Sequence, residues 1–452
     1  MFDKLQKLFN ETSELINSTS KDTRFRVISH YDADGIISAA IISKMLKRLG
    51  FNFHVTLMRN PFDKGLEKVA KEKNEITIFT DMGSGQIDTI EELPGKKIIL
   101  DHHQYQKEKT NENTIQINAN LCGINGNYEA CGSSLSYGLA KTINEKNIDL
   151  IALAVIGITG DKQYIGGIRG YNGELIKEGI ENKIIYEKTE MKLSGRTIRE
   201  ALYYSVEPFF ANISGNQKGT EDLLKEIKIK QDAEINKLTE EQINKLHSVL
   251  MLKLLKKGCE KNILDTVIRK RYYSDDFIYD AEAMADLLDS CGKGGNRGLG
   301  LSVAMGDKES FIEASKLELE YKQKILDELI RLEEEGFKEK ESFRYFLSND
   351  SSLGGVIAGI AANFIINKEK PLISIIRKNN EIHVSGRGNQ YLVKKGLDLG
   401  RAMKKAAQTL KGHGGGHAIA SGATIKSEKE EEFLNLIDEI ISKQILGQSN
   451  EN

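Results

Sequence analysis

Short apolar runs and helix-length segments alternate along the first hundred residues, and this alternation constrains the fold more than any other feature of the chain. The apolar runs predict strands at 24–29, 53–57, 76–80 and 97–100. Amphipathic segments predict helices at 1–20, 35–49, 64–73 and 84–92. Parallel neighbours need a long crossover, usually a helix, so this order predicts β-α-β units and an N-terminal parallel sheet.

Acidic and imidazole side chains stand where several of these strands end. They are His30, Asp32, Asp34, Asp81, Asp101, His102 and His103, and Asp161 joins them from a later Gly-Asp-Lys turn. In open parallel sheets the ligand crevice lies outside the carboxyl ends of the strands, so this fold would gather the groups in one place. Consecutive side chains at a strand end diverge, so His102 and His103 can face different sides of one site.

Carboxylates and imidazoles with little thiolate suit Mn²⁺ or Mg²⁺, and the imidazole nitrogens favour Mn²⁺. Two such ions about 3.5 to 4 Å apart are a common arrangement for hydrolysing phosphate esters. Asp81 stands alone at its strand end and is the natural candidate to bridge them. Any one of these aspartates by itself is better explained as a helix N-cap, so the prediction depends on the whole set.

Three of these residues have more than one interpretation. His30 could be a hydrogen-bonded core residue instead of a metal ligand. His103 could contact the scissile phosphate while His102 binds the metal. Asp101 could orient an imidazole without touching the ion, as metal-bound histidines commonly require.

A second α/β domain is expected towards the C-terminus. Its predicted elements are helices at 353–365, 395–410 and 428–441 and strands at 372–376, 382–385 and 418–424. The glycine-rich turn at 412–417 would let backbone N–H groups approach a phosphate, although such turns are also common tight loops. Arg387 could bring a guanidinium to the same anion. We therefore expect a phosphate-holding surface that faces the metals across a cleft between the domains.

The region between the two domains is predicted to be charged and helical. A linker begins near residue 211, and a helical segment at 221–256 would bury Leu246, Leu250, Leu252 and Leu255. Residues 164–171 and 291–298 are expected to form loops, and 308–340 one long connecting helix. Residues 149–158 are apolar enough for a buried helix or a buried strand, and periodicity cannot decide between them.

Composition sets broad limits on the function. A chain of 452 residues with 39% hydrophobic content can form two or three domains. Its net charge of −2 argues against indiscriminate coating of nucleic acid, but not against a local groove. No apolar run approaches a membrane span and no signal peptide is recognisable, so we expect a cytoplasmic protein without membrane contact. The four cysteines form no C-x-x-C pair, so neither a zinc ribbon nor a disulfide framework is expected.

The combined motifs resemble the DHH phosphoesterase superfamily and, more narrowly, the RecJ-like single-strand exonucleases of archaea. The resemblance rests on His-x-Asp-x-Asp-Gly, a strand-end Asp, Asp-His-His, Gly-Asp and a distant Gly-Gly-His with an upstream Arg, over about residues 23–205 and 345–445. It implies metal ligands at Asp32, Asp34, Asp81, His102 and Asp161, with His30 as a further ligand. The catalytic residues that it implies are the first five of these together with His103. It implies contacts to substrate phosphate or nucleotide at His103, Arg387, Gly414, Gly415, Gly416 and His417.

The resemblance also implies the domain organisation and a helix over 149–158. A DHH phosphoesterase domain would occupy 1–210, a helical insertion with a connecting helix 211–340, and a smaller DHH-associated α/β domain 341–447. Bacterial RecJ carries an additional oligonucleotide-binding β-barrel, for which we find no β-rich segment here.

The activity implied by this resemblance is an exonuclease that uses two Mn²⁺ ions, or Mg²⁺, on single-stranded nucleic acid in DNA replication or repair. It favours 5′ to 3′ action on DNA, while RNA stays open because nothing in the sequence recognises the 2′-hydroxyl. A second hypothesis is a phosphoesterase of short oligonucleotides, nucleoside bisphosphates or pyrophosphate. A third is a replisome scaffold with residual nuclease activity, in which the helical insertion binds GINS or a helicase. The insertion could equally be a spacer.

Overall fold

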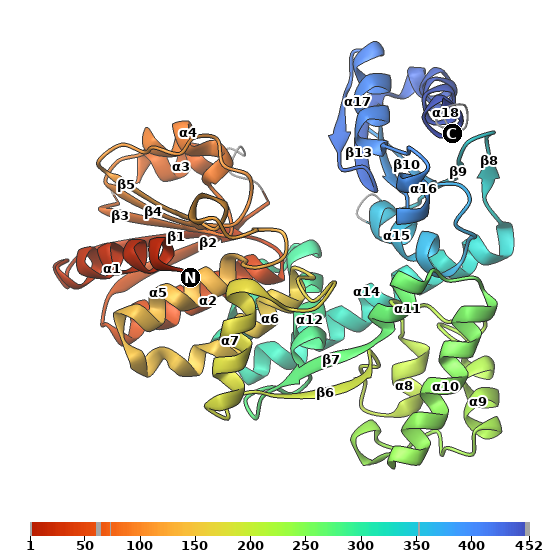
Figure 1. Ribbon diagram of the computed structural model, residues 1–452, viewed down its shortest axis with the longest axis horizontal. Helices are drawn as coiled ribbons and strands as arrows, with labels where there is room; N and C mark the ends of the chain where they lie inside the picture. The colour runs from red at the N-terminus through yellow and green to blue at the C-terminus, as the bar shows by residue number, and fades with distance from the viewer. Residues whose placement is uncertain (1, 60–64, 73, 351–352, 448–452) are drawn as a thin grey trace. The chain divides into compact units, whose positions relative to one another are not determined.

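The computed structural model describes residues 2–59, 65–72, 74–350 and 353–447. The chain forms two compact units, coloured along the sequence in Figure 1. The first comprises Met1–Glu190 and Lys270–Leu319, and the second comprises Met191–Arg269 and Glu320–Asn452. Helix α14 (Lys308–Glu335) begins in the first unit and ends in the second.

The first unit is built on a five-stranded sheet in which every neighbouring pair is parallel. The strands are β1 (Arg24–His30), β2 (Asn52–Met58), β3 (Ile76–Thr80), β4 (Lys96–Asp101) and β5 (Thr114–Asn118), in the order β2-β1-β3-β4-β5. The predicted N-terminal parallel sheet is therefore confirmed. Strand β2 lies on one side of β1, and β3 to β5 follow on the other side, so the strand order changes direction between β1 and β3. A ligand crevice is expected at the carboxyl ends of these two strands.

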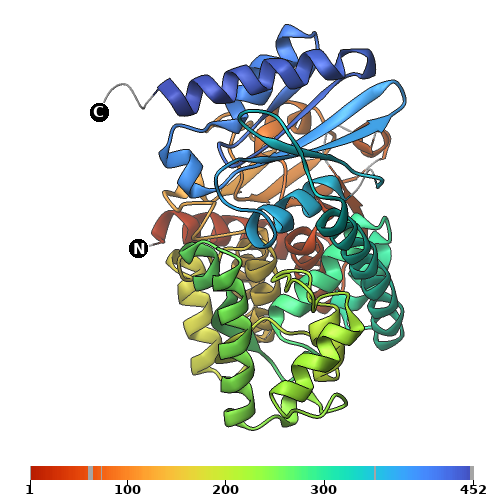
Figure 2. The ribbon, with the colours of Figure 1, turned by 90° about the vertical axis from the view of Figure 1, so that its right-hand side faces the viewer.

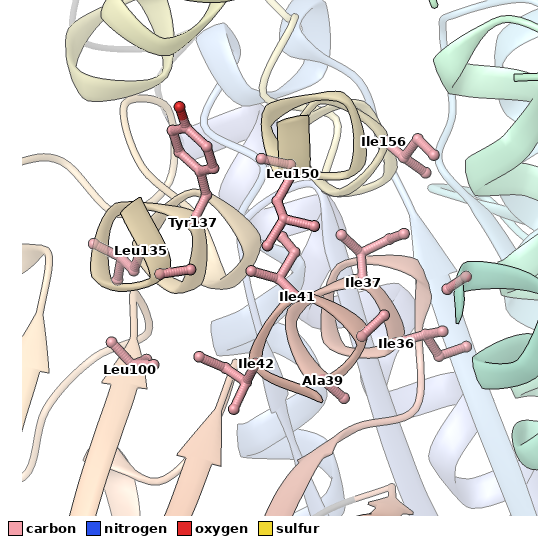
Figure 3. Close-up of a cluster of buried hydrophobic side chains, with 14 of the residues drawn as sticks. Ile36, Ile37, Ala39, Ile41, Ile42, Leu100, Leu135, Tyr137, Leu150 and Ile156 are labelled. Atoms are coloured by element: carbon pink, nitrogen blue, oxygen red, sulfur yellow. The ribbon is translucent and has the colours of Figure 1, made fainter. Parts of the chain in front are cut away.

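Helices cover both faces of this sheet. One face shares a large core with α1 (Asp3–Asn17), α2 (Ala33–Arg48), α5 (Gly132–Ile143), α6 (Ile151–Gly160), α7 (Gly170–Glu181), α12 (Ala281–Lys293) and α13 (Arg297–Met305). Figure 3 shows side chains of this core, among them Ile41 from α2, Leu135 from α5 and Leu100 from β4. The other face shares a smaller core with α3 (Gly65–Lys71) and α4 (Ile87–Glu91).

The segment at 149–158, which periodicity left undecided, is helical for most of its length and belongs to α6. Eight of the ten α6 residues are buried, because the helix packs among α2, α5 and α12. A helix that is apolar on all sides shows no amphipathic period, which explains why its sequence pattern was ambiguous. The loop predicted at 164–171 ends at Arg169, where α7 is capped.

The second unit contains α8 (Ile198–Tyr203), α9 (Gln217–Glu226), α10 (Glu240–Lys256) and α11 (Lys261–Val267). The prediction of one helical segment at 221–256 is wrong, because a break separates α9 from α10. On α10 the buried leucines are Leu246, Leu250 and Leu254, which are spaced four residues apart on one face. Leu252 and Leu255 are 55% and 54% exposed, so their predicted burial is also wrong.

Two other boundaries differ from the prediction. The loop expected at 291–298 shrinks to residues 294–296, because α12 continues to Lys293 and α13 begins at Arg297. The long helix expected at 308–340 ends at Glu335. Gly336 follows with a φ of 76°, the left-handed conformation that commonly closes a helix.

The second unit also holds a six-stranded sheet, visible from another side in Figure 2. Its strands are β8 (Lys338–Glu339), β9 (Arg344–Leu347), β10 (Leu372–Lys378), β11 (Glu381–Arg387), β12 (His413–Gly416) and β13 (Ala420–Lys426), in the order β12-β13-β11-β10-β9-β8. Helix α15 (Gly354–Phe364) packs against β10 and β11 in the core that this sheet shares with the helical region. Helices α17 (Leu399–Thr409) and α18 (Glu430–Gly447) belong to a separate core with the sheet.

Two predictions for this sheet domain are wrong in detail. The helix expected at 395–410 begins only at Leu399, after a short α16 (Gln390–Lys394), because Gly396 with a φ of 101° interrupts the chain. The glycine-rich stretch at 412–417 is not a turn but mostly strand β12, which pairs along β13 at the edge of the sheet.

A separate two-stranded ribbon consists of β6 (Tyr186–Met191) and β7 (Ile268–Tyr273). None of the described helices combines the length and the apolar run that crossing a bilayer requires.

The two faces of α10 provide a matched test of its packing. Leu254→Ala removes a side chain that is 2% exposed and should lower the free energy of unfolding by about 2 to 5 kcal/mol, through lost burial and a residual cavity. Leu255→Ala, at a side chain that is 54% exposed, should change it by no more than about 0.5 kcal/mol. Urea denaturation of the full chain measures both values. Equal losses would contradict the observed orientation of α10.

Candidate metal centre

The predicted ligand residues lie on loops and helix starts at the carboxyl edge of the parallel sheet. His30 is the last residue of β1, Asp32 caps α2, and Asp34 lies in the first turn of that helix. Asp81 follows β3 directly, and Asp101 ends β4 before His102 and His103. Asp161 follows the last residue of α6. Residues up to 131 positions apart along the chain, from His30 to Asp161, are brought to one edge of the fold.

Two triads of donor atoms form within this group. One consists of Asp81, His102 and His103, and the other of His30, Asp32 and Asp81, with the donor atoms of each triad within 4.8 Å of one another. Asp81 belongs to both. Its Oδ1 lies 3.1 Å from His102 Nε2 and its Oδ2 lies 3.6 Å from His30 Nδ1, so the two carboxylate oxygens face different histidines.

The backbone holds Asp81 tightly in this central position. Its N–H donates to the Leu100 carbonyl at 2.8 Å, and its φ is 55°, a left-handed conformation that costs a non-glycine residue about 1 kcal/mol. Gly132, the first residue of α5, packs against Asp81, because a Cβ added at Gly132 would lie 2.6 Å from the Asp81 Cβ. An unfavourable conformation at a buried carboxylate is typical of a functional position.

The His102 ring is oriented by a backbone carbonyl. Its Nδ1 lies 2.6 Å from the Gly126 oxygen, which can only accept, so Nδ1 carries the proton and Nε2 faces Asp81. Gly126 approaches so closely that an added Cβ would stand 1.9 Å from the His102 carbonyl oxygen. A larger residue at position 126 would therefore displace the strand end that carries the histidine.

Asp101 holds His103 and the turn that presents both histidines. Its buried carboxylate accepts hydrogen bonds from the backbone N–H groups of Ser84, His102 and His103 and lies 2.8 Å from His103 Nδ1. Asp101 thus contacts the ring of His103 and not that of His102. Because Nδ1 of His103 is engaged by Asp101, only Nε2 of this ring, whose side chain is 55% exposed, is available to a ligand.

Asp34 and Asp161 complete the cluster around His102. Asp34 accepts hydrogen bonds from the N–H groups of Gly132 and Ser133 at 2.7 and 2.9 Å, and its Oδ2 lies 3.9 Å from His102 Nε2. Asp161 Oδ2 lies 3.8 Å from His102 Nδ1. Neither aspartate is part of the two triads, but both lie close enough to add negative charge.

Gln163 is a functional candidate that the sequence did not indicate. Its buried side-chain amide donates to the Gly126 and Ala130 carbonyls, each at 2.9 Å, and to Asp161 at 2.7 Å. Its oxygen accepts a hydrogen bond from Asn172 at 2.6 Å. Gln163 therefore joins Asp161 to the carbonyl that orients His102. Glutamine is usually exposed, so only its position two residues after Asp161 could have drawn attention to it.

Crowding of charge changes the proton affinity of the cluster. Burial, with the charges of Asp81 and Asp161, raises the pKa of Asp34 to about 8. Burial also raises the pKa of Asp161 to about 6 against the opposing charge of His102. Burial disfavours a charged His30, but Asp32 and Asp81 outweigh it and raise the pKa of that imidazole to about 11. Such shifts mark an excess of negative charge that divalent cations can neutralise in place of protons.

The donor set fits a divalent cation with affinity for oxygen and some nitrogen. His30 Nδ1 is buried and makes no hydrogen bond of suitable geometry, although Asp32 Oδ2 lies 2.8 Å away. A cation beside it would satisfy this nitrogen together with the oxygens of Asp32 and Asp81. In that case His30, Asp32 and Asp81 would hold one ion, and Asp81 with His102 the other.

The remaining predicted residues belong to the second unit and lie near one another in its sheet. Arg387 pairs with Ala420, and Gly416 pairs with Ser421, so Arg387 and the end of β12 lie at the same end of the sheet. The His417 N–H donates to the Ala420 carbonyl at 2.8 Å. Arg387 also lies beside the start of α15, where its Nη2 is 3.0 Å from the position of a Cβ added at Gly355, and burial lowers the pKa of its guanidinium.

Comparison with known proteins identifies the family. Residues 24–158 match the DHH family N-terminal domain, and residues 344–443 match the DHHA1 domain. An uncharacterized protein of Methanocaldococcus jannaschii is 32% identical over 433 residues, which cover 93% of this chain and 94% of the relative. The chain belongs to the DHH family, whose members are metal-dependent phosphoesterases.

Two of the solved structures with a similar fold are an exonuclease and a CDC45. An exonuclease RecJ bound to manganese matches with a TM-score of 0.61 and 15% identity, covering 96% of this chain and 94% of that chain. CDC45 from Entamoeba histolytica matches with a TM-score of 0.64 and 15% identity, covering 98% of each chain. The RecJ-like fold expected from the motifs is confirmed. The domain boundaries at 210 and 340 stay predictions.

The contacts of Gln163 predict its effect on metal binding. Gln163→Leu removes the donors that hold Asp161 and the Gly126 carbonyl, so Mn²⁺ affinity should fall about 10- to 100-fold. Gln163→Glu should weaken binding at least as much, since a carboxylate cannot donate to the Gly126 and Ala130 carbonyls and would displace Asp161 from its position. Isothermal titration calorimetry measures the affinity. Gln6→Leu, an exposed glutamine on α1, serves as the control and should bind Mn²⁺ like the wild type. Unchanged affinity in folded Gln163→Leu would refute this role.

Proposed function

We propose that this protein is an exonuclease that hydrolyses phosphodiester bonds at the end of single-stranded nucleic acid, with two divalent cations and Mn²⁺ preferred to Mg²⁺. The observation that carries the proposal is the sharing of Asp81 between two triads of donor atoms. When bound, a pair of cations supplies an activated water and stabilises the charge that develops on the phosphate.

In this proposal the aspartates and His102 hold the cations, and His103 binds the scissile phosphate. Burial opposes a charged His103, but Asp101 outweighs it and raises the pKa of this imidazole to about 8. The ring is therefore largely protonated near neutral pH, and its Nε2–H can donate to a phosphate oxygen. The hydrogen bond that His103 Nδ1–H donates to Asp101 keeps the ring in this orientation, so no reorganisation is needed when the substrate arrives.

Contacts to a substrate phosphate or nucleotide are assigned to residues of the second unit. The two glycines Gly415 and Gly416 of β12 have φ values of 155° and 137°, and no heavy atom lies within 4 Å of a Cβ built on Gly415. An open, glycine-lined strand edge lets a phosphate approach backbone N–H groups, and Arg387 at the same sheet end adds a guanidinium. His417 would add a donor beside them.

The fold shared with a manganese-bound exonuclease RecJ supports exonuclease action. We assign single-stranded DNA and 5′ to 3′ polarity from the resemblance of the motifs to the RecJ-like exonucleases. A phosphoesterase that acts only on small molecules would not need the large helical region. The likeness to CDC45 supports a second proposal, that the helical region binds a replication protein such as GINS or a helicase. The exposed Leu252 and Leu255 of α10 offer apolar surface for such a partner.

The test compares end-labelled substrates with a matched pair of variants. Wild type with Mn²⁺ should release labelled mononucleotides from 5′-labelled single-stranded DNA from the first time point, and Asp81→Asn should reduce the rate about a hundredfold or more because it disrupts both triads. Asp22→Asn makes the same chemical change at an exposed aspartate before β1 and should act like wild type.

Three other outcomes are informative. Early release of mononucleotide from 3′-labelled strands alone would reverse the assigned polarity. Rapid release of phosphate from pyrophosphate or a nucleoside bisphosphate, with DNA and RNA both intact, would refute the exonuclease. Full activity in Asp81→Asn would refute the assigned centre.

A further inference from the structure

The exposed face of helix α17, in the second unit (Figure 1), carries basic residues and no acidic ones. Arg401, Lys404 and Lys405 are exposed, and Gln408 and Thr409 complete this face. None of the residues of α17 is acidic. Like charges three and four residues apart repel each other across a helix surface and destabilise the helix. The pattern is therefore unfavourable for folding, and an anionic ligand would relieve the repulsion.

One side of this face borders the glycine-rich strand β12. A Cβ added at Gly400 would clash with the Gly416 oxygen, and one added at Gly414 would lie 3.1 Å from the Ala407 Cβ. Lys404 stands four residues after Gly400 and three before Ala407, so it lies on the side of α17 that faces β12. The helix and the strand run in opposite directions, because the first turn of α17 meets the end of β12.

The other side of the face borders α18, against which α17 packs. The pKa of the Glu439 carboxyl on α18 is lowered chiefly by Lys443, and the charge of Lys405 adds to the effect. Part of the Lys405 charge is therefore balanced by an acidic neighbour. In the part of the chain that the structure describes, no carboxylate pairs with Lys404.

Arg401 and Lys411 extend the basic surface to the two ends of β12. Arg401 lies in the first turn of α17, where the Leu399 N–H donates to the Ala418 carbonyl at 3.0 Å. Its side chain is 86% exposed and lies 4.0 Å from Asp398, and such an exposed pair neutralises little charge. Lys411 is exposed and stands between the end of α17 and the start of β12. The bases thus follow β12 over about 15 Å, ten residues of helical rise.

The neighbouring strand edge is open. Strand β12 is the last strand of its sheet, so its outer side pairs with no other strand of that sheet, and three of its four residues are glycines. A row of bases beside an open glycine strand suits a chain of phosphates. The exposed face of α17 has no apolar residue, whereas a helix that binds a membrane surface needs an apolar side to insert. Single-stranded nucleic acid therefore fits this surface better than a lipid headgroup layer.

We propose that Arg401, Lys404 and Lys411 form a basic track that binds successive phosphates of a single strand along β12, on from the contacts assigned to Arg387 and His417. The proposal rests on the proposed function, since the strand is the substrate of that exonuclease. The track contacts phosphates and no bases, so it adds affinity for long strands without sequence preference.

The salt dependence of binding tests the track. Binding of a fluorescent oligothymidylate of about 20 nucleotides to the full-length protein is measured by anisotropy in EDTA, so that no cleavage occurs, over a range of NaCl concentrations. Each phosphate contact of a single strand adds about 0.7 to the slope of log affinity against log salt, so Lys404→Gln should weaken binding about fivefold near 0.1 M salt. The triple variant Arg401→Gln, Lys404→Gln and Lys411→Gln should lower the slope by about 2.

Two controls make the same chemical change elsewhere. Lys405→Gln lies one residue later on the side that faces α18, and its binding should stay within about twofold of the wild type, because salt screens a charge that contacts no phosphate. The triple variant Lys218→Gln, Lys225→Gln and Lys253→Gln removes the same charge from exposed positions of α9 and α10 and should keep the wild-type slope.

Each result separates the track from the exonuclease. Equal losses in Lys404→Gln and Lys405→Gln, or a wild-type slope in the first triple variant, would overturn the track, and a wild type that cleaves the strand with Mn²⁺ would then leave the exonuclease intact. The expected losses in a protein whose wild type cleaves no nucleic acid would overturn the exonuclease alone. Binding to phosphatidylserine vesicles that depends on the track, without binding of the oligonucleotide, would overturn the proposed ligand.

Discussion

Mutual repulsion among buried carboxylates is the constraint around which the N-terminal unit is arranged. Asp34 and Asp81 are almost completely buried, and Asp32 and Asp161 lie beside them. Burying several like charges is costly unless they are hydrogen-bonded and neutralised. Two imidazoles and the start of α5, which donates two N–H groups to Asp34, supply part of the compensation. Divalent cations shared through Asp81 would supply the rest.

The surrounding fold makes this arrangement rigid. The Gly126 carbonyl orients the His102 ring, and Asp101 orients the His103 ring. Gln163 connects the Gly126 carbonyl to Asp161. A ligand set held this way cannot move outward to relieve its repulsion, so the repulsion is reduced by bound protons or by divalent cations that replace them. An exonuclease RecJ and a CDC45 both share this fold, and a fold by itself does not determine an activity. The case for catalysis depends on the side chains at the strand ends.

The sequence predicted those strand ends well because two strong regularities coincide there. Apolar runs bounded by Asp and His mark where buried strands stop, and parallel strands necessarily share one carboxyl edge. Other features depend on tertiary context. Strand β5 has buried Thr114, Gln116 and Asn118 in place of an apolar pattern, and the glycines of β12 suit a turn as well as an edge strand. Several leucines of α10 are close together in the sequence, and only the four-residue spacing of Leu246, Leu250 and Leu254 marks the buried face. The role of Gln163 follows only from loops that meet in three dimensions.

The most direct test of the account is the number and position of cations bound at Asp81. Crystals grown with Mn²⁺ and measured near the manganese absorption edge locate the ions by anomalous scattering. We expect two peaks separated by about 3.5 to 4 Å, one beside each oxygen of the Asp81 carboxylate, the first near His102 and the second near His30 and Asp32. A single peak, or peaks that do not contact Asp81, would contradict it.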